Sequence, residues 1–170
     1  MNAIMYLVKT GCQWRMLPKD FPPYNTVFYY FNKWKLEGVF DELMDKLHVI
    51  VRNLMGREDT PSLGILDSRS IKSSHHVDSD RGIDGNKKIK GQKLIDDART
   101  KLGAEFKVVL RPDESSKKFA VLPLRWVVER SFSWLEDFRR IAMDYEFYSE
   151  TGVAMVQLAF CRLMYNKIYD

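Results

Sequence analysis

Apolar residues recur at helical spacing through the first part of the chain, so residues 1–55 are expected to be entirely helical. A first short helix should end near Thr10 and Gly11, because glycine permits the chain to turn there. A loop should follow, since the prolines at positions 18, 22 and 23 cannot continue a regular helix.

A second helix is expected over residues 26–36, capped by Asn25 or Thr26 and stopped by Gly38. A third helix should follow directly, because apolar residues return at helical spacing after the glycine. Three helices with a turn-rich joint resemble a helix-turn-helix arrangement. We therefore predict an N-terminal helical, helix-turn-helix-like segment over residues 1–60.

The second helix is open to two interpretations. Its aromatic residues Phe28, Phe31 and Trp34 suit the buried stripe of a helical bundle. It also carries side chains suited to phosphate or base contact in DNA, namely Tyr29, Asn32, Lys33 and Lys35.

The pattern changes after a polar stretch at residues 56–62. The apolar run at residues 63–66 is typical of a short buried strand, and Asp67 stands where that strand would leave the core. Burying a carboxylate costs several kcal/mol unless it is paired or holds a cation, so Asp67 is a site candidate. The alternative is an Asx turn with Ser68 or Ser70.

Residues 73–93 show little apolar periodicity, so a mobile loop is expected there. A basic loop beside an acid at a strand end suits a phosphate backbone, although a solvated run of charges would have the same composition. His75 and His76 do not indicate zinc, because no further pair of ligands follows at zinc-binding spacing. The basic residues of the loop are Arg81, Lys87, Lys88, Lys90 and Lys93.

The rest of the chain predicts a helix over residues 94–103, a strand over 104–111 and a last, core-packing helix over about 150–167. Between these, residues 124–140 contain no proline or glycine and are expected to form one helix. Its polar face would carry Glu129, either within solvated i,i+4 pairs or as a metal ligand. Those pairs would be Arg125 with Glu129 and Glu136 with Arg140.

Composition narrows the functional classes only a little. A formal charge of +4 over 170 residues permits an acidic partner such as nucleic acid without requiring one. Cys12 and Cys161 are far apart and suit core thiols in a reducing cytoplasm rather than a disulfide framework. No apolar stretch has the length of a membrane span or a signal peptide, so a cytoplasmic protein is expected.

Four stretches of the chain resemble the transposases of the insertion-sequence 5 group, which belong to the insertion-sequence 4 type of DDE transposases. They occur in the order of that family and read "TGCQWRMLPKDFPPYNTVFYYFNKW", "ILDSRSIK", "GNKKIKGQK" and "LPLRWVVERSFSWLEDFRRIAMDYE". The resemblance implies a helix-rich α+β fold, in which the helical segment precedes a ribonuclease-H-like catalytic core over residues 61–170. It also implies that the protein binds the terminal inverted repeats of the element and cleaves and joins DNA.

The resemblance assigns roles to three residues. Asp67 corresponds to the first catalytic carboxylate and Glu129 to the third, so both would be metal ligands and Glu129 would face a metal rather than water. Two divalent ions, Mg²⁺ or Mn²⁺, are expected to activate the attacking oxygen and stabilise the leaving oxygen. Arg125, one helical turn before Glu129, would hold a phosphate oxygen or orient the glutamate.

The chain departs from the family between the basic loop and the following helix. The strand that carries the family's second catalytic aspartate is missing, which we interpret as an internal deletion near Lys93 and Leu94; the N-terminus also begins inside the family's first helix. Asp96 and Asp97 are poor substitutes, because they lie in a predicted helix. Leu122 and Glu136 replace a tyrosine and a lysine of the family pattern, so accessory contacts should also change.

Two functional hypotheses follow. The first is a DDE transposase with metal-dependent DNA cleavage and strand transfer, severely impaired and only weakly metal-binding because the second acid is missing. The second is a non-catalytic remnant that binds the element ends, or forms a homodimer or a heterodimer with an intact transposase. Because the missing strands also leave a small sheet with exposed edges, we expect the core to have low stability.

Overall fold

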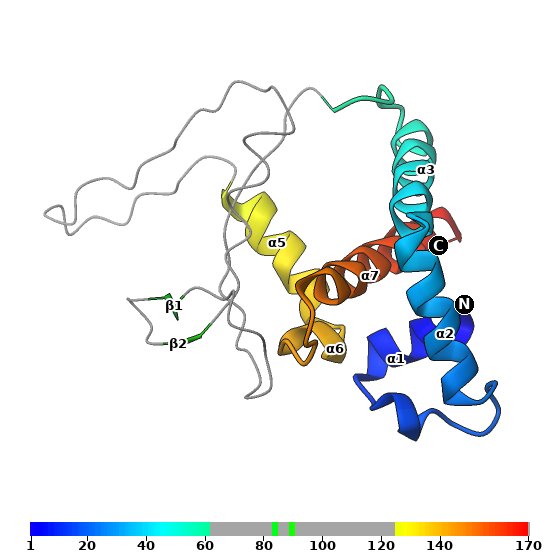
Figure 1. The fold of residues 1–170 in the computed structure, drawn as a ribbon. Coiled ribbons are helices and arrows are strands. Elements are labelled where there is room, and N and C mark those ends of the chain that lie inside the picture. Colours follow the sequence, from blue (N-terminus) through cyan, green and yellow to red (C-terminus); the bar gives the residue numbers. More distant parts are fainter. Residues whose placement is uncertain (62–82, 85–88, 91–124, 170) are drawn as a thin grey trace, which may run out of the picture.

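The structure, a computed structural model, describes residues 1–61, 83–84, 89–90 and 125–169 (Figure 1). The described part is helix-rich, as predicted. Its only strands, β1 (Ile83–Asp84) and β2 (Ile89–Lys90), pair antiparallel within the stretch for which we expected an irregular loop. The helices are α1 (Asn2–Thr10), the 3₁₀ turn η1 (Trp14–Met16), α2 (Tyr24–Leu36), α3 (Val39–Leu54), α5 (Arg125–Glu136), α6 (Arg139–Ala142) and α7 (Ser149–Tyr169).

The predicted strands at residues 63–66 and 104–111 and the predicted helix at 94–103 lie outside the described residues. None of the helices that the structure describes combines the length and the apolar character needed to cross a membrane.

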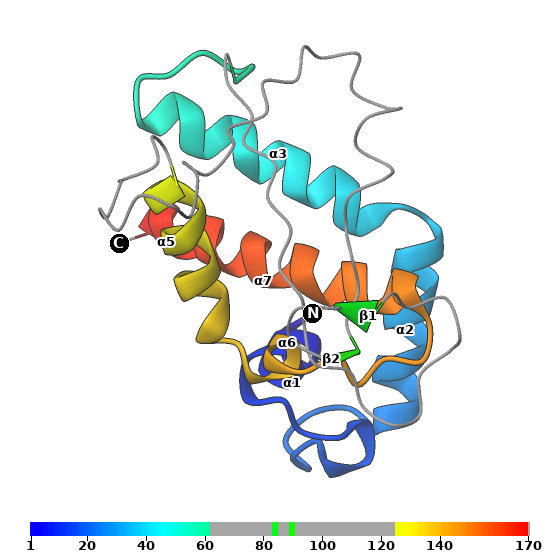
Figure 2. The same ribbon diagram turned by 90° about the vertical axis from the view of Figure 1, so that its left-hand side faces the viewer.

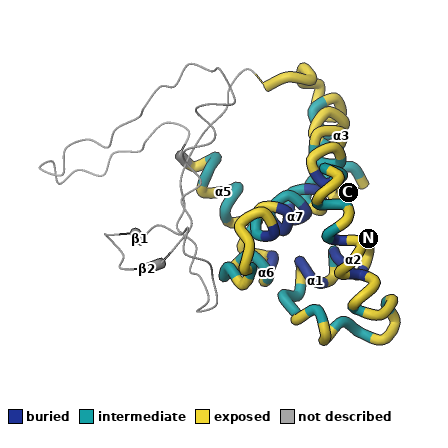
Figure 3. The backbone as a smooth tube through the Cα atoms, in the orientation of Figure 1, coloured by how far each residue is buried: buried dark blue, intermediate teal, exposed yellow. Residues whose placement is uncertain are grey.

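The two ends of the chain build one core. Helix α3 lies along α7, and α1 packs against both α6 and α7 (Figures 1 and 2). Figure 3 shows the buried positions gathered where these helices face one another. The buried core residues are Ala3, Ile4, Leu7, Val8, Val27, Phe31, Phe40, Phe138, Ala154, Met155, Leu158 and Ala159.

The second helix begins earlier than the capping pattern predicts. Pro23, rather than Asn25 or Thr26, occupies the N-cap position, and its carbonyl oxygen accepts hydrogen bonds from the backbone N–H groups of Thr26 and Val27. A proline suits this position because the donor that it lacks would find no helical partner there. The helix ends as expected before Gly38, whose φ of 72° makes the joint to α3.

The aromatic stripe of α2 is only partly buried. Phe31 is fully buried, but Phe28 is 43% exposed and Trp34 is half-buried against the core. The prediction that all three form the buried stripe is therefore wrong for Phe28, whose ring packs against Trp14 where α2 lies at the edge of the described helices (Figure 1).

The helix predicted over residues 124–140 is broken. Helix α5 ends at Glu136, and Phe138 has extended backbone angles, φ −103° and ψ 102°, before α6 begins. No proline or glycine causes the break. Burial of Phe138 in the core shared with α1 and α7 stabilises the broken arrangement.

Gly11 ends α1 in the left-handed conformation, with φ 69°, and donates its N–H to the carbonyl oxygen of Leu7 at 2.8 Å. It also lies against α6. A Cβ added at Gly11 would stand 3.0 Å from the Cβ and 3.1 Å from the carbonyl carbon of Arg139. Gly11 therefore allows both the turn and the close approach of two segments far apart in sequence.

We expect Gly11→Ala to lower the free energy of unfolding by about 2 kcal/mol, because it adds crowding against Arg139 to the cost of a left-handed alanine. Gly38→Ala is the matched control. Gly38 has the same backbone conformation, but nothing lies within 4 Å of its added Cβ, so about 1 kcal/mol is expected. Chemical denaturation of both variants measures the difference, and equal losses would show that the contact with Arg139 contributes nothing.

Candidate functional site

Helix α5 carries the candidate carboxylate. Arg125 is its first residue, and Glu129 follows one turn later on the exposed side of the helix, together with Ser133 and Glu136. The helical spacing therefore predicted this outward face correctly. The opposite side of α5 turns toward the core through Leu135, which packs against the buried cluster.

An aromatic and guanidinium ladder runs along α5 beside Glu129. The guanidinium carbon of Arg130 lies 4.8 Å from the ring centroid of Trp126 and 5.0 Å from that of Trp134. Both indoles are about half exposed, at 55% and 45%. The spacing of four residues could have revealed this ladder, because such residues share one helix face.

A metal site cannot be assembled from the described residues alone. Asp67 lies outside them, and no group of three His, Cys, Asp or Glu side chains that could hold a metal occurs within them. Glu129 therefore stays a candidate ligand, and the described residues do not supply further ligands beside it.

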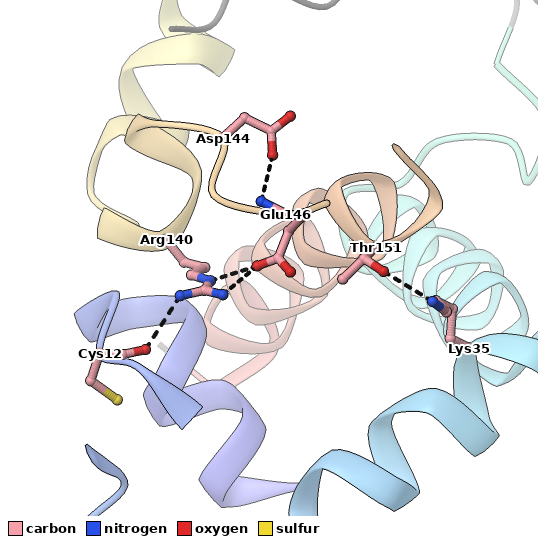
Figure 4. Close-up of polar contacts among 6 residues, drawn as sticks. All are labelled: Cys12, Lys35, Arg140, Asp144, Glu146 and Thr151. Carbon is pink, nitrogen blue, oxygen red and sulfur yellow. Dashed lines mark hydrogen bonds and ion pairs between the residues drawn. The ribbon is translucent and has the colours of Figure 1, made fainter. Parts of the chain in front are cut away.

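The polar residues of α2 have structural partners. The ammonium of Lys35 donates to the hydroxyl oxygen of Thr151 on α7 at 3.0 Å, which links the two helices (Figure 4). Lys33 forms an exposed pair with Glu37, with 3.9 Å between nitrogen and oxygen, and the Asn32 amide donates to the carbonyl oxygen of Phe28. Tyr29 is exposed and packs edge-on against Tyr30.

The basic loop is described only through its short strands. Lys90 is the last residue of β2, whereas Lys87, Lys88 and Lys93 lie outside the described residues. Their assignment to phosphate binding stays a prediction.

Arg140 does not pair with Glu136 on a solvated face, as the i,i+4 spacing suggested. Its Nε donates to a carboxylate oxygen of Glu146 at 2.8 Å, and a second guanidinium nitrogen contacts the same oxygen (Figure 4). A third nitrogen donates to the carbonyl oxygen of Cys12 at 3.4 Å. The break before α6 turns Arg140 inward, which the unbroken helix assumed from the sequence could not predict.

Both cysteines are free thiols, and the prediction that they are core residues holds fully for Cys161 alone. Burial raises the pKa of Cys161 to about 11. Cys12 is half-buried at the edge of the core.

Two families of known proteins match the chain. Residues 1–44 match a family of transposases of the IS4/5 type, and residues 99–164 match the transposase DDE domain family. Glu129 lies inside the second match and Asp67 lies between the two. No curated protein and no solved structure matches the chain. Both segments point to one kind of protein in the order that the motifs predict, and together the two matches support an IS4/IS5-type DDE transposase.

Proposed function

We propose that this chain is a transposase-derived DNA-binding protein in which DNA cleavage and strand transfer are severely impaired. The observation that carries the proposal is the position of Glu129, which lies within the segment matched to the transposase DDE domain and on the exposed face of α5. An exposed carboxylate beside an arginine-containing helix face can approach a DNA backbone, whereas a buried one could not.

Asp67 and Glu129 are the proposed metal ligands, and Arg125 is proposed to hold a phosphate oxygen beside them. A bound divalent ion would supply Lewis acidity at the scissile phosphate. Two carboxylates give fewer ligand oxygens than the three acids of the family pattern, so the ion should bind weakly. The proposed internal deletion near Lys93 explains the missing acid.

The remaining expectations about architecture belong to the same proposal. Residues 1–60 would form the DNA-facing helical segment, and residues 61–170 the remainder of a ribonuclease-H-like core. The shared core of α1, α2, α3 and α7 joins the segment matched to the IS4/5 transposases directly to the helices of the DDE match. The two parts would therefore act together as one helical body.

A nicking assay tests the proposed function. Purified chain is incubated with a labelled supercoiled plasmid and Mg²⁺ or Mn²⁺, beside the Glu129→Gln variant. We expect both proteins to retard duplex DNA in a gel, and neither to convert supercoiled plasmid to nicked plasmid above background.

If the wild type nicks the plasmid and Glu129→Gln does not, another acid completes the site, and the proposal that cleavage is impaired is wrong. If the folded wild type fails to retard duplex DNA at low salt, the proposed DNA binding is wrong.

A further inference from the structure

Three exposed cations lie on the segments that pack together where the two ends of the chain meet. Lys9 lies near the end of α1, Arg15 lies in η1 and Arg139 begins α6. The close approach of Gly11 to Arg139 brings these segments together, and α1 and α6 lie side by side in both orientations (Figures 1 and 2). We call Lys9, Arg15 and Arg139 the α1–α6 patch.

Aromatic rings hold two of these cations in place. The Lys9 ammonium lies 5.0 Å from the ring centroid of Phe138, and the Arg15 guanidinium carbon lies 6.0 Å from that of Tyr24. Such contacts restrict long side chains before any ligand arrives, so less side-chain entropy remains to be lost on binding. All three cations are therefore exposed, and Lys9 and Arg15 are partly preorganised.

The positive charges of the patch are also available to bind an anion. No ion pair among the described residues involves Lys9, Arg15 or Arg139, and the acid nearest to Arg139 along the chain is the exposed Asp137. The cations of α2 and α3 differ, because Lys33 pairs with Glu37 and Lys46 pairs with Glu42. The hydrogen bond from Lys46 lowers the pKa of Glu42, so this acid keeps its charge at neutral pH.

The start of α3 would in contrast repel a polyanion. Asp41, Glu42 and Asp45 are exposed within its first two turns. The cations at the junction of α1 and α6 are thus separated from the carboxylates at the start of α3.

We propose that the α1–α6 patch, rather than Lys33 and Lys35 of α2, is the surface through which the helical body contacts the phosphates of duplex DNA. This inference rests on the proposed DNA binding and locates the DNA-contacting surface on the protein. Arg15 is four residues from Gly11, which is at most about 14 Å of extended chain. Duplex DNA carries one charge per roughly 1.7 Å of axis, so several phosphates lie within that span.

The affinity for a labelled duplex of mixed sequence, measured by fluorescence anisotropy at several salt concentrations, tests the patch. Phosphate contacts do not depend on sequence, so the element ends are not needed. For Lys9→Gln/Arg15→Gln/Arg139→Gln we expect affinity at least about tenfold lower at moderate salt. The slope of log affinity against log salt should be shallower by about 3, or about 1 for each phosphate that the variant no longer neutralises.

The matched control is Lys46→Gln/Arg162→Gln/Lys167→Gln, which removes the same charge from exposed positions on α3 and α7. We expect its salt slope to change by less than about 1. Arg15→Gln/Arg139→Gln retains Lys9 over Phe138 and so tests the patch without disturbing that ring contact; its slope should fall by about 2. Restoring charge with Lys9→Arg/Arg15→Lys/Arg139→Lys should restore the slope.

The outcomes separate this inference from the function on which it rests. A wild type that does not bind duplex DNA overturns the DNA binding and the patch together. A wild type that binds, with equal slopes for the patch and control variants, overturns the patch alone. If the patch variant instead keeps its DNA affinity but loses self-association in sedimentation velocity, the DNA contact is wrong and the patch meets the acidic α3 of a second copy.

Discussion

Arg140→Met should lower the free energy of unfolding by about 3 kcal/mol, one of the two largest effects that we expect from a single substitution. The Arg140 and Glu146 side chains are only 9% and 13% exposed, and two guanidinium nitrogens contact the same carboxylate oxygen. Removing the guanidinium leaves Glu146 without this cation in a place that little water reaches. Urea denaturation followed by circular dichroism measures the loss.

Arg139→Met is the control for Arg140→Met, because the neighbouring side chain is exposed and makes no ion pair within the described residues. We expect a change within about 0.5 kcal/mol. The double variant Arg140→Met/Glu146→Leu should recover most of the stability, since two apolar side chains can replace a buried pair. If Arg140→Met and Arg139→Met unfold at the same urea concentration, the buried pair does not stabilise the fold.

Phe31→Ala should cost about 3–5 kcal/mol, because it empties the place of a large, fully buried side chain. The ring contacts Trp14 of η1 and Phe40 of α3, with centroid separations of 5.3 and 5.6 Å. Losing it should therefore loosen α2 against both of these elements. Thermal unfolding should show a lower midpoint together with a reduced near-ultraviolet signal from tryptophan.

Phe28→Ala provides the comparison on the same helix. Its ring also contacts Trp14, with 5.1 Å between centroids, but the side chain is 43% exposed. We expect a loss of about 1 kcal/mol, since folding removes less apolar surface from water at this position. A loss equal to that of Phe31→Ala would mean that α2 buries Phe28 against something other than the described residues.

Local sequence signals predicted the helices with clear ends. Gly11 and Gly38 end α1 and α2 as expected, and α7 runs from Ser149 to Tyr169 close to its predicted limits. Glycine conformation and apolar spacing act over one or two turns, so they can be recognised without knowledge of the fold. The exposed position of Glu129 follows from the same short-range periodicity.

Features that depend on distant residues could not be predicted in this way. The break at Phe138 follows from burial against α1, and Arg140 turns to Glu146 because the break changes its direction. Lys35 meets Thr151 across 116 residues of sequence, so a pattern within α2 alone suggested a DNA contact instead. The α1–α6 patch was missed for the same reason, since its cations come from both ends of the chain.

The shared core of the two chain ends also determines how the protein should respond to changes in length. Helices α3 and α7 pack together, although a long stretch of chain, from Leu54 to Arg125, lies between α3 and α5. For a flexible connection between packed helices, the entropy cost of closure grows only with the logarithm of its length, and doubling or halving the length changes the free energy by about 0.6 kcal/mol. The helical body should therefore tolerate insertion or loss of segments between α3 and α5, so the proposed deletion near Lys93 would leave the packing of α3 against α7 unchanged.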